Sequence, residues 1–197
     1  MEILKNVALI FAQNQRLETQ RLILRPVTLA DVADMYAYSK DEETTTFVFP
    51  THRTQEETAS SIANYFMAAP LGKYGIELKE TNRLIGTIDL RVNEAYKSGE
   101  LGYVLNKNYW GQGIIPEAAN ELVRVGFERL ELNRIYAYHD EENQKSGRVM
   151  EKIGLVREGR IPAARINKGK VVTDIQYGLT KDTWLTKKTC YNRSIIK

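Results

Sequence analysis

The segment best suited to chemistry is Trp110-Gly-Gln-Gly-Ile-Ile-Pro116, which lies where a strand pattern gives way to a helix pattern. Glycine lets the backbone approach a ligand closely, because it has no Cβ. The first turn of a helix leaves N–H groups unpaired, and the helix dipole adds about half a positive charge. The segment therefore predicts an anion site that suits a pyrophosphate. It would be built from Gly111, Gln112, Gly113, Ile114 and Ile115, with Lys107 adding charge.

Two glycines also occur in ordinary strand-to-helix turns, so the segment is not specific by itself. A P-loop requires Gly-Lys-Ser/Thr after four spacers, which the residues from Gly113 onward lack. A dinucleotide-binding fingerprint requires a third glycine at position 116, where proline stands. Asp140 could imitate the ribose-binding acid of that fingerprint, so a dinucleotide-binding oxidoreductase remains as the weaker alternative.

The elements that must position this segment follow from capping signals and from hydrophobic periodicity. Thr28 to Asp31 and Thr54 to Glu57 each place a hydroxyl three residues before an acid, which predicts the start of a helix. A long amphipathic helix follows the glycines and extends to Leu130, and a short one covers Lys145 to Ile153. Strands are predicted at residues 21–25, 74–78, 84–92, 99–105, 133–139, 155–161 and 171–179.

The long helix joins two of these strands as a crossover. The unit from Glu100 through the helix to His139 is a strand–helix–strand connection, so its two strands should be parallel. The early strands are joined by short turns and should be antiparallel. The sequence therefore predicts a mixed α/β sheet with one parallel pair.

Composition limits the class of protein. The 197 residues suit one domain with a full core, and a net charge of +3 is too small to indicate nucleic-acid binding. Cys190 is the only cysteine, and His52 and His139 lack metal-ligand spacing, so no metal site is predicted. The N-terminus lacks the pattern of a signal peptide, and no apolar run approaches a membrane span. We expect a cytoplasmic protein without a membrane or nucleic-acid partner.

A second segment directly follows the crossover strand. It reads Asn143-Gln-Lys-Ser-Gly-Arg-Val-Met-Glu-Lys-Ile-Gly154. Together with Tyr-Trp-Gly-Gln-Gly at 109–113, the Glu-Ala pair at 117–118 and the opening strand at 18–26, it resembles the GNAT superfamily of acetyltransferases, in the branch of the RimJ and RimL protein N-terminal acetyltransferases. The one departure is Asn108, where the broader superfamily pattern has glutamine or arginine.

The resemblance covers residues 18–185 and implies a domain organisation. Residues 1–18 would be an N-terminal extension, 19–185 the acetyltransferase domain and 186–197 a basic tail, either disordered or a docking end. The implied fold is a mostly antiparallel seven-stranded sheet with one splayed parallel pair and helices on both faces. Acetyl-CoA is the implied cosubstrate, without a metal.

The resemblance also implies roles along the splayed strands. Backbone groups of Tyr103, Val104 and Leu105 would pair with the pantetheine arm, and Asn143 would order its loop and could bond the pantetheine. Ser146 would hydrogen-bond the departing thiolate, and it also suits the cap of a helix; Tyr136 and Tyr138 are rival donors. Lys145 and Arg148 could meet cofactor phosphates.

Direct transfer requires a neutral amine, because an ammonium has no lone pair, so a carboxylate should take its proton. Glu100 is the first candidate for this base, since it begins the strand that leads to the glycine segment. Asp89 and Asp174 are alternatives, each in an otherwise apolar strand. A backbone N–H near Tyr103 or Val104 could meet the oxyanion.

The predicted function is transfer of acetyl from acetyl-CoA to a primary amine, either a peptide α-amine or a small-molecule amine such as a polyamine. A CoA-binding sensor without turnover is the non-enzymatic alternative. Apolar residues at positions 4–12 suit a homodimer contact. The aromatic residues around the second helix are expected to pack in the core or to wall the acceptor pocket: Phe47, Phe49, Tyr65 and Phe66.

Overall fold

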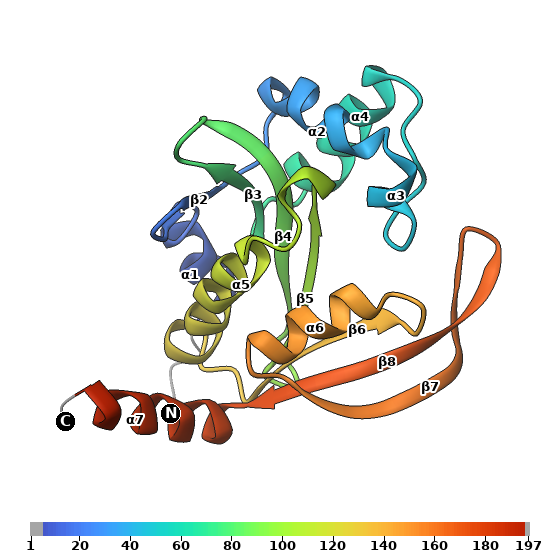
Figure 1. Ribbon diagram of the computed structural model, residues 1–197. Helices are drawn as coiled ribbons and strands as arrows, with labels where there is room; N and C mark the ends of the chain where they lie inside the picture. The colour runs from blue at the N-terminus through green and yellow to red at the C-terminus, as the bar shows by residue number, and fades with distance from the viewer. Residues whose placement is uncertain (1–5, 196–197) are drawn as a thin grey trace.

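The computed structural model describes the backbone of residues 6–195 and the side chains of residues 6–188. A single eight-stranded sheet lies at its centre, in the order β1-β2-β3-β4-β5-β6-β8-β7 (Figure 1). The strands are β1 (Leu17–Glu18), β2 (Leu22–Arg25), β3 (Lys73–Leu78), β4 (Arg83–Asn93), β5 (Ser98–Leu105), β6 (Arg134–Asp140), β7 (Val156–Asn167) and β8 (Lys170–Thr180). The expected number of seven is wrong by one, because the two-residue strand β1 pairs with β2 at the edge.

Seven α-helices and four single turns of other helix types connect these strands within the described residues. The α-helices are α1 (Val7–Gln13), α2 (Val32–Ser39), α3 (Glu42–Thr45), α4 (Gln55–Ser61), α5 (Ile114–Arg124), α6 (Gln144–Lys152) and α7 (Lys181–Ile195). The 3-10 turns are η1 (Leu29–Asp31) and η3 (Lys107–Tyr109), and the π-helical turns are η2 (Ile62–Met67) and η4 (Val125–Arg129).

The predicted topology is confirmed. Every neighbouring pair of strands is antiparallel except β5 and β6, which are parallel. Their ladder covers only Ser98 to Glu100 against Arg134 to Tyr136, whereas β4 pairs with β5 as far as Leu105. Strands β5 and β6 therefore separate after Glu100, and the second half of β5 has no neighbour on that side.

Helices cover both faces of the sheet, as expected. The larger core packs the apolar stripe of α5, together with α1 and α6 residues, against one face of β2 to β6. Ala118, Ala119 and Leu122 of α5 are fully buried there. The smaller core packs α2 and η2 against the opposite face through Met35, Tyr38 and Ile62.

Both predicted capping signals are present. The Thr28 N–H donates to Asp31 Oδ2 at 2.8 Å, and the Glu57 N–H donates to Thr54 Oγ1 at 3.2 Å. Asp31 also holds Arg25 through two bonds, so the end of β2 is tied to the start of α2.

The two ends of the chain form helices within the described residues. Helix α1 lies within the predicted extension and buries Phe11 in the larger core. Helix α7 continues to Ile195, so of the two alternatives for the tail from residue 186, a disordered end is wrong up to that residue and a docking end stays a prediction. Residues 1–5 and 196–197 lie outside the described residues, and these include Leu4 and Lys5 of the segment proposed for dimerisation. Within the part that is described, no helix has the length and apolar character to cross a bilayer.

Candidate active site

The glycine turn before α5 is open. Gly111 and Gly113 have φ angles of 78° and 75°, in the left-handed region that favours glycine. A Cβ at Gly111 would meet no atom within 4 Å, and one at Gly113 would approach only Arg21, at 3.7 Å. None of the N–H groups from Gly111 to Ile115 donates a hydrogen bond to a residue that the structure describes. The turn thus retains the free donors that a diphosphate requires.

The turn is held from outside by Arg21, next to β2. Its Nη1 donates to the Gln112 carbonyl at 3.0 Å, and its Nε donates to Glu117 Oε2 at 2.7 Å. Glu117 also accepts bonds from Thr19 Oγ1 and from the Arg21 N–H. Burial opposes ionisation of Glu117, but these bonds lower its pKa. The Glu117 carboxylate therefore fixes the first turn of α5 to the β1–β2 hairpin.

The Gln112 side chain turns away from the predicted anion site. Its Nε2 donates to the Asn108 carbonyl at 3.1 Å, so only its backbone can contribute to a cradle. The Trp110 indole donates to the Leu105 carbonyl at 2.8 Å. That carbonyl therefore already accepts one bond and has one lone pair left, and the expected pairing of the Leu105 backbone with pantetheine stays a prediction.

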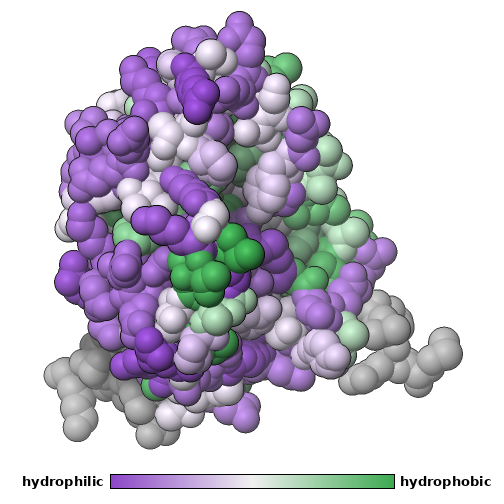
Figure 2. Space-filling view, turned by 90° about the vertical axis from the view of Figure 1, so that its right-hand side faces the viewer, coloured by the Kyte–Doolittle hydropathy of each residue, from purple (hydrophilic) through white to green (hydrophobic). Residues whose placement is uncertain are grey.

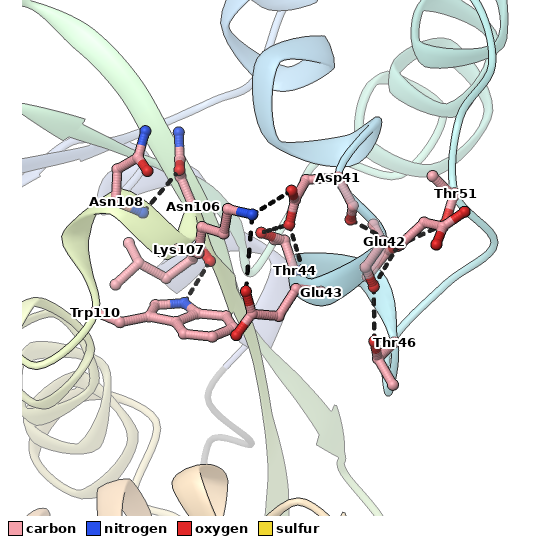
Figure 3. Close-up of polar contacts among 12 residues, drawn as sticks. Asp41, Glu42, Glu43, Thr44, Thr46, Thr51, Asn106, Lys107, Asn108 and Trp110 are labelled. Atoms are coloured by element: carbon pink, nitrogen blue, oxygen red, sulfur yellow. Dashed lines mark hydrogen bonds and ion pairs between the residues drawn. The ribbon is translucent and has the colours of Figure 1, made fainter.

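Lys107 does not stand free beside the turn (Figure 3). Its Nζ donates to Asp41 Oδ2 at 2.6 Å and lies 3.7 Å from Glu43 Oε2. The bond to Asp41 raises the pKa of Lys107, and the same bond lowers the pKa of Asp41 to about 2. Lys145 lies 3.5 Å from Glu43 and 4.1 Å from the Trp110 ring centroid. Both lysines thus bind residues 41–48, here called the α3 segment, instead of presenting unpaired charges to the cradle.

One cavity of about 980 Å³ brings most of the predicted residues together. It extends from the glycine turn along the second half of β5 to the ends of β6 and α6, and the α3 segment forms its opposite wall. The predicted residues that line it are Glu100, Tyr103, Val104, Leu105, Gly111, Gly113, Ile114, Ile115, Asn143 and Ser146. Gln112, Asp89 and Asp174 are not part of its lining.

Tyr103 and Ser146 bridge the gap between β5 and α6. Their hydroxyl oxygens are 2.8 Å apart, and the Tyr103 hydroxyl also donates to the Ser146 carbonyl at 3.1 Å. The Asn143 side chain accepts from the Ser146 N–H at 3.3 Å and caps α6. Burial raises the pKa of Tyr103, partly offset by the bond to Ser146. Tyr103 therefore remains a neutral hydroxyl next to Ser146.

Glu100 and Asp89 share one arginine. Arg91 Nη2 donates to Glu100 Oε1 at 2.5 Å, and Arg91 Nη1 donates to both oxygens of Asp89 at 2.6 and 2.7 Å. Tyr65 donates a further bond to Asp89 Oδ2 at 2.5 Å. The Tyr136 hydroxyl lies 3.4 Å from Glu100 Oε2. Of the two carboxylates, Glu100 faces the cavity, whereas Asp89 is buried.

The third carboxylate, Asp174 on β8, is buried and bound by Arg165 from β7. Among the aromatic residues, Phe47 lines the cavity, whereas Phe49 and Phe66 pack against the smaller core. The His52 ring bonds Thr58 and Ser61, away from the cavity. No group of three metal-ligating side chains occurs among the residues with described side chains.

The sequence matches the acetyltransferase (GNAT) domain family over residues 21–156. The chain belongs to the GNAT acetyltransferases. Members of this family use acetyl-CoA, so the open turn before α5 fits the expected cosubstrate. The family match also decides against the alternative of a dinucleotide-binding oxidoreductase.

Similar proteins span nearly the full domain. An uncharacterized N-acetyltransferase, p20 of Bacillus licheniformis, is 30% identical over 85% of this chain and 97% of its own length. The GNAT-family acetyltransferase structure from Bacillus anthracis has a TM-score of 0.77 at 26% identity and covers 85% and 99% of the two chains. The ribosomal-protein-S5-alanine acetyltransferase structure from Vibrio fischeri has a TM-score of 0.71 at 21% identity, covering 86% and 98%. The last likeness concerns the fold alone.

Several residues of this acetyltransferase site are absent from the sequence prediction. Arg21 belongs to the opening motif, but the sequence does not reveal its distant partners Gln112 and Glu117. Arg91 is two residues from Asp89, and this strand spacing puts both side chains on one face of the sheet, which is a usable signal. Arg165 lies in a segment without any motif, so no sequence signal pointed to it.

Proposed function

We propose that this acetyltransferase transfers the acetyl group to a primary amine by direct attack in a ternary complex. The observation that carries the proposal is the separation of β5 from β6 after Glu100, inside one cavity that also contains the open turn before α5. The turn would hold the diphosphate through free N–H groups, and the second half of β5 would accompany the pantetheine arm. The thioester would then lie in the gap between the strands.

Glu100 is proposed to take the proton of the attacking amine, directly or through water. It lies at the last pairing of β5 with β6, and its carboxylate lines the cavity. Asp89 is held by Arg91 and Tyr65, and Asp174 is held by Arg165, both outside the lining. A general base must lie within hydrogen-bond reach of the amine proton that it takes. Of the three carboxylates, Glu100 is favoured because it lines the cavity.

Ser146 is proposed to donate a hydrogen bond to the departing thiolate. Its position at the start of α6, on the other side of the gap from β5, supports this role. The Tyr103 hydroxyl would orient the Ser146 hydroxyl from β5. As the new C–N bond forms and the C–S bond breaks, the amine proton passes to Glu100 and the sulfur leaves as a thiolate stabilised by Ser146.

The acceptor is proposed to be a primary amine, with a peptide α-amine and a small-molecule amine as the two classes. The Vibrio fischeri protein named for ribosomal protein S5 supports the first class by likeness of fold alone. Tyr138, Arg165 and Glu100 line the end of the cavity opposite the glycine turn. Their chemistry supports the second class and is developed below.

Two measurements test the proposal. Calorimetry should detect saturable binding of acetyl-CoA, and a thiol-release assay should detect CoA when acetyl-CoA is mixed with one of a panel of primary amines. The mass of the product should increase by one acetyl group. Binding without acetylation of any amine would instead favour a CoA sensor, and the absence of acetyl-CoA binding would refute both readings.

A further inference from the structure

Strand β7 contains an irregularity that places Arg165 over the sheet. Ile161 pairs with Asp174 and Arg165 pairs with Val172, so three residues of β7 lie opposite one residue of β8. Within this bulge, Ala163 has a φ of 52°, which is uncommon for a residue with a side chain. Bulges next to functional sites often redirect a side chain, and strained residues often accompany them.

Arg165 is bound by the protein through one nitrogen only. Its Nε donates to the two oxygens of Asp174 at 3.2 and 3.1 Å. Its guanidinium carbon lies 5.6 Å from the centroid of the Tyr138 ring. To the extent that side chains are described, neither Nη1 nor Nη2 has a hydrogen-bond partner. Arg165 therefore lines the cavity with its terminal fork available, while Asp174 orients the guanidinium.

Arg91 provides the contrast in the same cavity. Both of its terminal nitrogens are engaged, Nη1 by Asp89 and Nη2 by Glu100. Its charge is therefore neutralised within the protein, and it has no fork to offer a ligand. Arg148 also lines the cavity, but it belongs to α6 and not to the β7 bulge.

Tyr138 links Arg165 to the proposed base. Its ring centroid lies 5.6 Å from the Arg165 guanidinium carbon, and burial, followed by the charge of Glu100, raises the pKa of Tyr138. One tyrosine side chain thus separates an anionic group from a cationic fork. A ligand with an amine at Glu100 and an oxyanion at Arg165 would span this side chain.

We propose that Arg165 binds an oxyanion of the acceptor, so that the acceptor is a small primary amine carrying a carboxylate or a phosphate. This inference rests on the proposed function of the same site. A guanidinium fork matches the geometry of carboxylate and phosphate oxygens, and two parallel bonds fix the ligand in one orientation. A polyamine would bring a second ammonium, which has no lone pair to accept a bond from the Arg165 fork, so the site disfavours a polyamine.

The test uses matched pairs of amines with saturating acetyl-CoA. Each amino acid is compared with its amide, and each aminoalkyl phosphate with the corresponding amino alcohol, so the two arms distinguish carboxylate from phosphate. We expect the anionic member of at least one pair to have a kcat/KM about 10-fold to 100-fold higher, as for hydrogen bonds to charged groups. Arg165→Met should remove this preference by lowering only the anionic member, and Arg165→Lys should retain part of it.

Arg160→Met is the matched control, because Arg160 lies on the same strand and is bound to Glu141 at the surface. The control should keep the preference, and all three variants should bind acetyl-CoA like the wild type. If acetyl-CoA binds but turnover is too slow, calorimetric binding of the same pairs to the CoA complex gives the same comparison.

The proposal would be overturned, with acetyl transfer intact, if the anionic and the neutral member of each pair were acetylated or bound equally well. A preference for the anionic amine that survives in Arg165→Met would overturn it too. A kcat/KM for spermidine or for a short peptide amide that exceeds that of every anionic amine would also overturn it. If acetyl-CoA itself fails to bind, the proposed function fails instead.

Discussion

At the scale of single residues, charge pairing decides which side chains remain available for chemistry. Asp89 accepts bonds from Arg91 Nη1 on both of its oxygens, and Asp174 is ion-paired with Arg165. Glu100 accepts a bond from Arg91 on one oxygen, and its other oxygen lies near the Tyr136 hydroxyl. Three carboxylates that look equivalent along the chain thus have different surroundings. Only the one that lines the cavity can reach a bound amine.

Glu100→Gln should lower kcat/KM by roughly 10²-fold to 10⁴-fold, the usual contribution of a positioned general base. Acetyl-CoA affinity should stay unchanged. The defect should shrink as the pH rises towards the pKa of the acceptor amine, because the neutral nucleophile then forms without help. Steady-state kinetics across pH check this, with Glu94→Gln on the exposed β4–β5 turn as the control. Full activity in Glu100→Gln at neutral pH would exclude this residue as the base.

Ser146→Ala should lower kcat about 10-fold to 100-fold, since it removes one hydrogen bond to a developing thiolate. Tyr103→Phe should lower kcat less, because its hydroxyl acts through Ser146. The double variant should be no slower than Ser146→Ala, since the second change removes a contact that is already lost. Additive losses in kcat would show that Tyr103 acts independently of Ser146.

At the scale of elements, the active site depends on where two elements stop following their neighbours. Strand β5 continues for five residues beyond its last pairing with β6, and α5 is preceded by Gly113, which has a left-handed backbone conformation. The α3 segment forms the opposite wall of the cavity and is held in place by the bond from Lys107 to Asp41. At the tip of the β7–β8 hairpin, Lys168 donates to the Thr45 carbonyl of the same segment. Figure 1 shows this long hairpin projecting from the sheet towards α3.

Gly113→Val should weaken acetyl-CoA binding strongly. A side chain at φ 75° costs about 1–2 kcal/mol of backbone energy, and the turn would rearrange to relieve it. Calorimetry with CoA, alongside thermal unfolding, separates lost binding from lost folding. Gly159→Val is the matched control, because a Cβ there meets no atom within 4 Å and its φ is ordinary. Equal CoA affinities of the two variants would contradict a backbone cradle at this turn.

At the scale of the whole molecule, the N-terminal segment is part of the folded unit. Phe11 lies in the larger core, and the Tyr74 hydroxyl donates to the Asn14 carbonyl at 2.8 Å. At the other end, Trp184 of α7 packs on Phe127, with ring centroids 5.3 Å apart. The division at residues 18 and 186 stays a prediction about domains. The first flanking segment contacts the larger core through Phe11, and the last one bonds the domain through Lys187 Nζ and the Gly154 carbonyl. The side of the molecule turned towards the viewer in Figure 2 is mostly hydrophilic, with small apolar patches.

Phe11→Ala should destabilise the protein by about 3–5 kcal/mol, as is typical when a buried phenylalanine is truncated. Chemical denaturation with a constant m-value measures the change in the free energy of unfolding. Leu9→Ala is the control, because Leu9 belongs to the same helix and is 55% exposed. A loss below about 1 kcal/mol for Phe11→Ala would show that residues 7–13 are an appendage to the core.

The sequence alone determined the features that depend on neighbours along the chain. The glycine turn, the capped helices at Thr28 and Thr54, and the crossover that makes β5 and β6 parallel all follow from local residue types and spacing. Periodicity identified the buried stripe of α5 for the same reason. These features are local, so a window of a few residues carries them.

Only the tertiary structure decided which charges are free. The charge of Lys107 is paired with Asp41, which is 66 positions away in the sequence. Arg21 donates to the carbonyl of Gln112 in the glycine turn from 91 positions away. Arg165 keeps an unoccupied fork because a bulge in β7 turns it over Tyr138. Partners this distant are brought together by the packing of the whole sheet, and residue types along the chain do not encode which acid each base will meet.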